Sequence, residues 1–247
     1  MSLSLQCLIP STVYAREDTK QTMTEYNIKL SKGHILIDNG EGWLLVDTGS
    51  PRSCHEAGRI NLDGRRFSVP TTIPFYNIDA DYLSEKIGER VRGLVGMDIL
   101  RRTGVKIDLP GGKITVGCST EGMRRVPSSI GLMGYVSVDM NVNGQQARLV
   151  LDTGAPISYA SPSITEGLEA VDHVTDFHPS LLGGTESIET PIFEFPASFA
   201  GYGFTMRAGH LPLALRLELS LLGASGVIGL ELFRRFPIAI AEDSVWV

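Results

Sequence analysis

The chain contains the segment Leu44-Leu45-Val46-Asp47-Thr48-Gly49-Ser50 and, further along, a near copy of it, Leu149-Val150-Leu151-Asp152-Thr153-Gly154-Ala155. Both copies place three apolar residues directly before an aspartate and follow it with threonine and glycine. The apolar residues predict a buried strand, and glycine permits the tight turn that comes after it. Each copy is therefore expected to present a carboxylate where a buried strand enters a turn.

A second pair of similar segments follows the first pair in the same order. The two segments are Gly93-Leu94-Val95-Gly96-Met97-Asp98-Ile99-Leu100-Arg101-Arg102 and Gly226-Val227-Ile228-Gly229-Leu230-Glu231-Leu232-Phe233-Arg234-Arg235. Because both segments recur in the same order, the chain is predicted to contain an internal duplication. We predict an N-terminal domain at residues 1–125 and a C-terminal domain at residues 126–247, joined by a linker at 119–129 that is rich in turn-forming residues.

Short strands are predicted throughout both halves. The pairs Asn39-Gly40 and Asn143-Gly144 predict β-hairpins, since both residues tolerate the positive φ of a type I′ turn. The expected arms are 35–37 with 43–46 and 136–142 with 147–151, and further strands are expected at 106–109 and 113–116. One short helix is expected in each half, at 97–102 and 230–235. The predicted fold class is all-β, with two related lobes and a cleft between them.

Composition narrows the possible functions. The 247 residues are 43% hydrophobic and carry a net charge of −6, so a core can form and binding to a phosphate backbone is disfavoured. No apolar run approaches the roughly 20 residues that cross a bilayer. No basic region precedes an apolar stretch at the start, and the predicted location is the cytoplasm. Cys7, Cys54 and Cys118 show no zinc-binding spacing and are expected to be free thiols, so no metal or cofactor is predicted.

Duplication gives the two aspartates a special geometry. A single aspartate at the end of a strand is most often a turn former, and duplication alone explains a second copy. However, two homologous lobes packed about a pseudo-twofold axis present the same feature to each other. Two carboxyl groups that face each other cannot both ionise easily, so they are expected to share one proton.

The apolar-apolar-Asp-Thr-Gly-Ser/Ala motif, followed downstream by apolar-apolar-Gly, resembles the aspartic proteases. Each half is similar in size to a retropepsin unit, so the chain looks like a pepsin-like pseudo-dimer in which one chain holds both halves. The resemblance implies that Asp47 and Asp152 form a catalytic dyad. It also implies that Thr48 and Thr153 lock the two loops together, and the supporting residues would be Gly49, Ser50, Gly154 and Ala155.

The function that this resemblance implies is that of an aspartic endopeptidase acting on peptide or protein substrates, without metal or cofactor. The expected state is a monomer with an internal pseudo-dimer, and a homodimer is an alternative. A second hypothesis is a catalytically silent peptide-binding module of the same fold. The intact pair of aspartates argues against it, because such a module has no need of two facing carboxyl groups. A third is a self-associating protein whose lobes pair between chains.

Two finer expectations concern the site. Ser50 can donate a hydrogen bond to the Asp47 carboxylate, whereas Ala155 has no donor, so the shared proton is predicted to reside mainly on Asp152. A flap that excludes water is expected over the cleft. The candidate turns are those around Gly64 in the first half and around Gly183 and Gly184 in the second.

Overall fold

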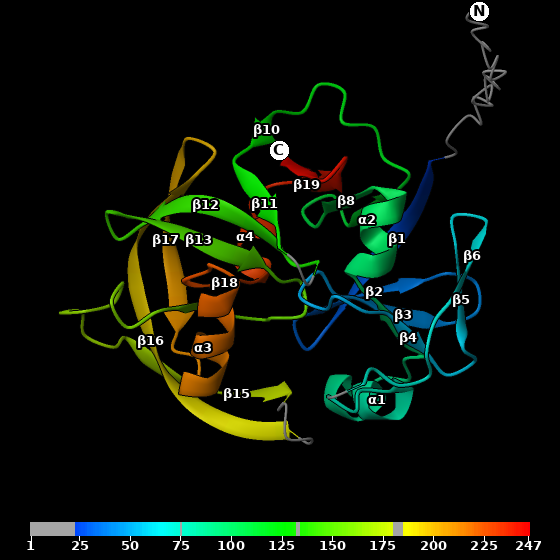
Figure 1. The fold of residues 1–247 in the computed structure, drawn as a ribbon, viewed down its shortest axis with the longest axis horizontal. Coiled ribbons are helices and arrows are strands. Elements are labelled where there is room, and N and C mark those ends of the chain that lie inside the picture. The colour runs from blue at the N-terminus through cyan, green and yellow to red at the C-terminus, as the bar shows by residue number, and fades with distance from the viewer. Residues whose placement is uncertain (1–22, 75, 132–133, 180–184) are drawn as a thin grey trace, which may run out of the picture.

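The computed structural model describes residues 23–74, 76–131, 134–179 and 185–247. Strands account for 46% of the structure and helices for 13%, which confirms the predicted all-β class. The strands form a ten-stranded sheet, an eight-stranded sheet and a separate hairpin of β5 (Arg59–Leu62) and β6 (Arg65–Ser68). Figure 1 shows the two large sheets side by side.

The ten-stranded sheet draws on both ends of the sequence. Its members are β1 (Thr24–Ser31), β2 (His34–Asp38), β3 (Trp43–Val46), β4 (Cys54–His55), β7 (Gly93–Val95), β8 (Val105–Asp108), β9 (Lys113–Val116), β10 (Arg125–Val126), β19 (Ile238–Ala241) and β20 (Ser244–Trp246). Their order in the sheet is β10-β20-β19-β8-β9-β1-β2-β3-β7-β4. The last two strands of the chain thus return to the sheet that the first half builds.

The eight-stranded sheet is formed by the second half alone. Its members are β11 (Ser128–Ile130), β12 (Val136–Val142), β13 (Gln145–Leu151), β14 (Ser158–Ala160), β15 (Asp172–Pro179), β16 (Thr185–Phe199), β17 (Tyr202–Gly209) and β18 (Gly226–Ile228). Their order is β11-β12-β13-β18-β14-β17-β16-β15, and β12 also pairs with β16, which closes six strands into a ring. The chain passes from the first sheet to the second at Pro127, within the predicted linker.

The repeat in the sequence is also a repeat in the structure. In the first half β3 pairs in parallel with β7, and in the second half β13 pairs in parallel with β18. The registers match, because Leu45 lies opposite Leu94 and Val150 lies opposite Val227. In each half the backbone N–H of the aspartate then donates to the carbonyl that ends the parallel partner strand, at 3.0 Å.

In each half, the second repeated segment requires a glycine because its backbone passes close to the loop that carries the aspartate. A Cβ atom on Gly96 would lie 2.6 Å from the carbonyl oxygen of Arg52. A Cβ atom on Gly229 would overlap the carbonyl oxygen of Ala155 in the same way. Both close approaches hold an aspartate-bearing loop against the strand-to-helix turn behind it.

The structure has four helices in its described part: α1 (Ala80–Ile87), α2 (Met97–Thr103), α3 (Leu213–Leu221) and α4 (Leu230–Phe233). The predicted helices correspond to α2 and α4, but the prediction of one helix per half is wrong, since α1 and α3 give each half a second. The helix α1 begins at Asp79, whose carboxylate accepts from the N–H of Tyr82, and ends at Gly88 in the left-handed conformation. It buries Leu83 and Ile87, which supplies the packing that a short helix needs.

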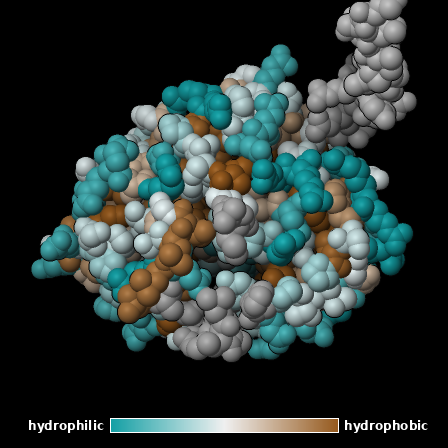
Figure 2. All heavy atoms as spheres, viewed as in Figure 1, coloured by the Kyte–Doolittle hydropathy of each residue, from teal (hydrophilic) through white to brown (hydrophobic). Residues whose placement is uncertain are grey.

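The helix α3 is apolar on both faces. Leu213, Leu217 and Leu221 are 62%, 59% and 89% exposed, and Figure 2 shows the apolar stripe over this helix. With nine residues, α3 is the longest helix of the described ranges, and none of these helices is long and apolar enough to cross a membrane.

The two Asn-Gly turns differ. Asn143 and Gly144 have φ values of 49° and 76°, as expected for the predicted two-residue turn between β12 and β13. In the first half the pairing ends at Asp38 and Trp43, so Asn39-Gly40 is part of a four-residue loop and the predicted type I′ turn is wrong there. The side chain of Asn39 instead donates to the carbonyl of Asn61 at 2.9 Å, which ties this loop to the β5–β6 hairpin.

The two cysteines that the structure describes, Cys54 and Cys118, are free thiols, as predicted. Burial raises the pKa of the Cys54 thiol to about 12. This thiol therefore stays protonated and has little nucleophilic character at neutral pH. Cys7 lies outside the described residues.

Candidate active site

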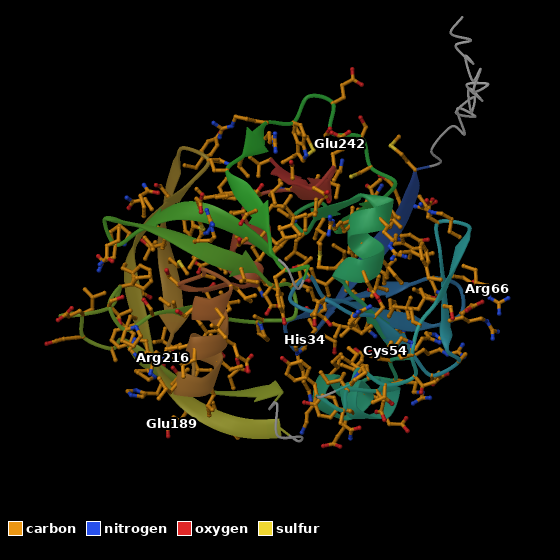
Figure 3. The ribbon with its side chains drawn as sticks, in the orientation of Figure 1. His34, Cys54, Arg66, Glu189, Arg216 and Glu242 are labelled. Carbon is orange, nitrogen blue, oxygen red and sulfur yellow. The ribbon has the colours of Figure 1, made fainter. Side chains whose placement is uncertain are left out.

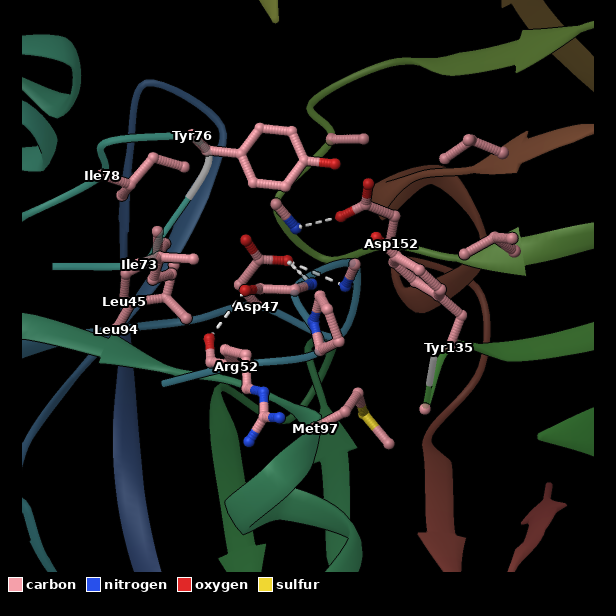
Figure 4. Close-up of a pocket in the computed structure, with 18 of the residues that line it drawn as sticks. Leu45, Asp47, Arg52, Ile73, Tyr76, Ile78, Leu94, Met97, Tyr135 and Asp152 are labelled. Carbon is pink, nitrogen blue, oxygen red and sulfur yellow. Dashed lines mark hydrogen bonds between the residues drawn. The ribbon is translucent and has the colours of Figure 1, made fainter. Parts of the chain in front are cut away.

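The two aspartates meet on the floor of a cavity of about 1300 Å³ that both halves of the chain line. Asp47 directly follows β3 and Asp152 directly follows β13, and Figure 4 shows their side chains next to each other. Each carboxyl group lies against the glycine of the opposite loop. A Cβ atom on Gly154 would lie 2.7 Å from the carboxyl carbon of Asp47, and one on Gly49 would overlap the Asp152 carboxyl group.

Backbone N–H groups hold both carboxyl groups in place. Gly49 and Ser50 donate to Oδ1 of Asp47 at 2.8 and 3.1 Å. Gly154 donates to Oδ1 of Asp152 at 2.8 Å. Because these donors belong to the turn that each aspartate itself begins, the Asp-Thr-Gly sequence sets the orientation of its own carboxyl group.

Thr48 and Thr153 join the two loops through four buried hydrogen bonds. Each threonine hydroxyl accepts from the N–H of the other threonine at 3.0 Å. The Thr48 hydroxyl donates to the carbonyl of Leu151 at 2.9 Å, and the Thr153 hydroxyl donates to that of Val46 at 2.7 Å. The structure thus contains the network expected of these two residues, and the network fixes the position of one aspartate relative to the other.

We expect Thr48→Val to lower the free energy of unfolding by roughly 2–4 kcal/mol. Valine has the same shape as threonine, but it leaves the N–H of Thr153 and the carbonyl of Leu151 buried without a partner, and each such group costs about 1–3 kcal/mol. Chemical denaturation monitored by circular dichroism measures the change. Thr205→Val is the matched control, because Thr205 is exposed. Equal stabilities of the two variants would contradict this account of the network.

Burial and mutual repulsion favour a proton shared by the two carboxyl groups and held mainly by Asp152. Burial raises the pKa of Asp47. Burial and then repulsion from Asp47 raise the pKa of Asp152 well above its usual range. Two neighbouring carboxyl groups disfavour each other's ionisation, so the pair titrates as a unit. This direction agrees with the predicted location of the proton.

The predicted reason for that location is wrong. The hydroxyl of Ser50 donates to the carbonyl of Arg52 at 2.7 Å, and it is the backbone N–H of Ser50 that donates to the Asp47 carboxylate. Two backbone donors on Asp47 therefore favour its charged form. A serine at position 155 in place of Ala155 would consequently not be expected to supply a donor to Asp152.

The shared proton makes the stability of the fold depend on pH. A carboxyl group whose pKa is raised by folding contributes stability at low pH, and this stability is lost as the pH rises through the raised value. Asp152→Asn removes that loss, so the variant should gain stability over the wild-type protein as the pH rises from 3 to 7. Thermal melts at each pH measure it, and a gain of 1 kcal/mol corresponds to about 2–4 °C for a chain of this size. Asp81→Asn, at a side chain that is 87% exposed, should show no such gain, and parallel curves for the two variants would contradict the raised pKa.

Two tyrosines, one from each half, lie above the dyad. Tyr76 is at the tip of a turn closed by the bridge between Ile73 and Ile78, and Figure 4 shows its ring extending over the two aspartates. Tyr135, which immediately precedes β12, lines the same cavity from the second half. Burial raises the pKa of both hydroxyls, so both remain protonated and can act as donors close to the dyad.

The flap predicted at Gly64 stays a prediction. Gly64 does occupy a hairpin turn, between β5 and β6, but no residue of this turn lines the cavity. The turn packs against β1 instead, where the hydroxyl of Thr24 donates to the Asp63 carboxylate at 2.6 Å and the N–H of Asp63 donates to the hydroxyl of Tyr26 at 2.9 Å. The other candidates, Gly183 and Gly184, lie outside the described residues.

The cavity-lining side chains that sequence reasoning did not assign to the site include Tyr76, Tyr135, His34 and Asp176. None of these four belongs to the repeated motifs, so no sequence signal distinguished them.

His34 brings the first half into contact with the second. It begins β2 yet lies between the two halves, as Figure 3 shows, and it lines the cavity together with Asp176. Gly33 next to it packs on Pro156 of the second half. Burial lowers the pKa of His34, so its ring is neutral at pH 7.

The chemistry of the site is that of a carboxylic acid paired with a carboxylate. Among the described residues, no group of three or more His, Cys, Asp or Glu side chains is placed to hold a metal ion. One carboxylate that accepts a proton and one carboxylic acid that donates a proton can together perform general acid–base chemistry on a bound molecule. No protein-family model matches this chain, and no curated protein is similar to it in sequence.

Proposed function

We propose that the protein is an aspartic endopeptidase, in which two retropepsin-like lobes of one chain form a pseudo-dimer around Asp47 and Asp152. One observation carries the proposal. The two carboxyl groups come from equivalent, interlocked loops and lie next to each other on the floor of a large cavity. A pair arranged only for structure would not need an open cavity above it.

The proposed reaction is hydrolysis of a peptide bond by water. The ionised Asp47 takes a proton from a water molecule held between the two carboxyl groups, and the oxygen of that water attacks the peptide carbonyl carbon. Asp152 donates its proton to the carbonyl oxygen as the carbon becomes tetrahedral. Asp47 then passes the proton taken from water to the peptide nitrogen, the C–N bond breaks, and a hydroxyl of the tetrahedral diol returns a proton to Asp152. This releases an amine and a carboxylic acid and restores the pair.

The cavity is suited to an extended peptide. Its volume of about 1300 Å³ is above the usual range for small-molecule pockets. Apolar side chains flank the dyad on both sides, with Leu45 and Leu94 in the first half and Val150 and Val227 in the second. A peptide lying across the dyad would place consecutive side chains into these walls, as strands do when they bind in a groove.

Incubation with denatured casein and a peptide library between pH 3 and pH 8 tests this function. Mass spectrometry should find internal cleavage products from the wild-type protein, and a statine-containing peptide should both inhibit the cleavage and raise the melting temperature. Cleavage that persists unchanged in Asp47→Asn and Asp152→Asn would overturn the proposal. Peptide binding without any cleavage would favour the alternative of a silent binding module.

A further inference from the structure

A positively charged side chain belongs to the loop that also carries Asp47. Arg52 comes shortly after Asp47 in the sequence, is exposed, and lines the cavity. Figure 4 shows its side chain extending away from the two carboxyl groups, beside Met97. Arg52 is therefore placed to meet a side chain of a bound peptide, at some distance from the bond that reacts.

The backbone of Arg52 is held firmly on both sides. Its carbonyl accepts a hydrogen bond from the Ser50 hydroxyl at 2.7 Å, and Gly96 passes close to the same carbonyl. The next residue, Ser53, is fully buried, and its hydroxyl accepts from the N–H of Gly96 at 2.8 Å. Only the side chain of Arg52 is left to be ordered by a ligand, which limits the entropic cost of binding.

The guanidinium group of Arg52 has no partner in the part of the chain that the structure describes. No described carboxylate forms an ion pair with it, and no described group accepts a hydrogen bond from it. The acids Asp98 and Asp243 also line the cavity, but their partners are different. Asp98 accepts from the Ser53 hydroxyl at 2.5 Å, and Asp243 pairs with Arg101.

The cavity as a whole carries charges of both signs. Lys86 lines it from the first half, and Asp176 and Glu218 line it from the second. Its overall charge consequently does not select a ligand. A preference for one sign of charge has to come from direct contact with a group that is not already paired, and Arg52 is such a group.

The duplication shows that this cation occurs beside only one of the two aspartates. The segment Ser50-Pro51-Arg52 aligns with Ala155-Pro156-Ile157. The position equivalent to Arg52 is therefore occupied by Ile157, which packs against a buried cluster in the second half. A ligand that crosses both aspartate loops meets a guanidinium group in one loop and an apolar side chain in the other.

We propose that Arg52 binds the side-chain carboxylate of a glutamate or aspartate in the substrate. The planar guanidinium group can donate two parallel hydrogen bonds to one carboxylate. An extended peptide across the dyad would pass both loops, and only the loop of Asp47 offers this donor. The inference rests on the proposed function and names its substrate class, which is peptides with an acidic residue close to the scissile bond, on one side of it only.

Peptides with Glu or Gln at each of the three positions on either side of the cleaved bond test this assignment. Their ends are acetylated and amidated, so the varied side chain supplies the only carboxylate, and pH 6 keeps it ionised. We expect kcat/KM to be about fivefold higher for Glu than for Gln at a position on one side. This ratio corresponds to about 1 kcal/mol, the upper end for an exposed ion pair. It should shrink in 1 M NaCl, because salt screens exposed charges.

Substitutions at Arg52 should change this ratio directly. Arg52→Gln should bring the ratio for Glu over Gln to about one, and Arg52→Glu should give a preference for Lys instead. Each ratio compares two peptides with the same variant, so a general effect on the dyad cancels. The matched control is Arg66→Gln, an exposed cation on β6 that does not line the cavity and is labelled in Figure 3. This control should keep the full ratio.

Two results would overturn the assignment while the endopeptidase function stands, because cleavage itself is still observed. One is a ratio of about one at every position in the wild-type protein. The other is a preference that persists in Arg52→Gln. If Arg102→Gln removes that persisting preference, the carboxylate is bound by Arg102 of α2, which also lines the cavity, and the assignment to Arg52 is wrong.

Binding measurements separate the two proposals when no peptide is cleaved. Asp152→Asn leaves the loop of Arg52 unchanged and should bind a Glu peptide more tightly than the matching Gln peptide, as measured by fluorescence polarisation at pH 6. Selective binding that Arg52→Gln abolishes, without any cleavage by the wild-type protein, would support the role of Arg52 and overturn the endopeptidase function. Absence of both cleavage and selective binding would overturn both.

Discussion

Replacing either Asp47 or Asp152 by asparagine is expected to lower kcat/KM on a cleavable peptide by about a thousandfold or more. General acid–base catalysis contributes roughly 10²–10⁴-fold, and each variant removes one of its two partners. Asparagine has the size of aspartate and can still accept the N–H of Gly49 or Gly154. The loss would therefore reflect missing proton transfer, with little change in the geometry of the loops.

The double variant provides a stricter check of this mechanism. Residues that act as a unit show strongly non-additive effects, so Asp47→Asn with Asp152→Asn should be no slower than the slower single variant. Asp81→Asn, an exposed acid-to-amide change at the start of α1, should retain full activity. Steady-state kinetics compares the two single variants, the double variant and Asp81→Asn with the wild-type protein, and circular dichroism checks that each one is folded. Residual activity of more than a tenth in either single variant would show that the pair is not the catalyst.

The fold near the dyad could be predicted from the sequence because the residues that determine it are close together in the chain and occur twice. The apolar triplets before Asp47 and Asp152 and the glycines of the second repeated segment predicted buried strands, turns and α2 and α4. The equivalence of the two halves then followed from the alignment of the segments. In the structure the aligned segments form equivalent parallel pairs, β3 with β7 and β13 with β18.

Features that depend on contacts between residues far apart in the sequence could not be predicted in this way. Alternating leucines at 213, 215, 217, 219 and 221 are typical of a strand. This segment is nevertheless the helix α3, which packs Leu219 on a buried cluster that includes Val150 and Val227. The return of β19 and β20 to the first sheet joins segments that are more than 100 residues apart in the chain. No local pattern in the sequence specifies such a pairing.

The side chains above the dyad were missed for a related reason. Tyr76 and Tyr135 come from opposite halves, and they line the same cavity only in the folded arrangement of the two halves. Tyr76 lies two residues after Pro74, where an aromatic residue is most simply interpreted as packing a loop. In the structure Tyr76 lines the cavity instead. The turn that holds Gly64 packs on β1, and this contact is likewise not specified by the local sequence.

Gly154→Ala should damage both activity and stability, because the two loops have no space for an added methyl group. A Cβ atom at this position would lie 2.7 Å from the carboxyl carbon of Asp47. Gly154 does not have a positive φ, so the effect would be steric. A displacement of about 1 Å can cost about a hundredfold in rate, and overpacking costs about 1–3 kcal/mol in stability.

The matched control for Gly154→Ala is Gly203→Ala, where the nearest atom to an added Cβ would be 3.9 Å away. We expect Gly154→Ala to lose about a hundredfold in kcat/KM when rates are measured well below its melting temperature, and Gly203→Ala to match the wild-type protein. Gly49→Ala should behave like Gly154→Ala, since its methyl group would overlap the Asp152 carboxyl group. Full activity in both variants would mean that the two carboxyl groups are not held in contact with the opposite loops in solution. In that case the hydrogen bonds between Thr48 and Thr153 could not be what sets the spacing of the dyad.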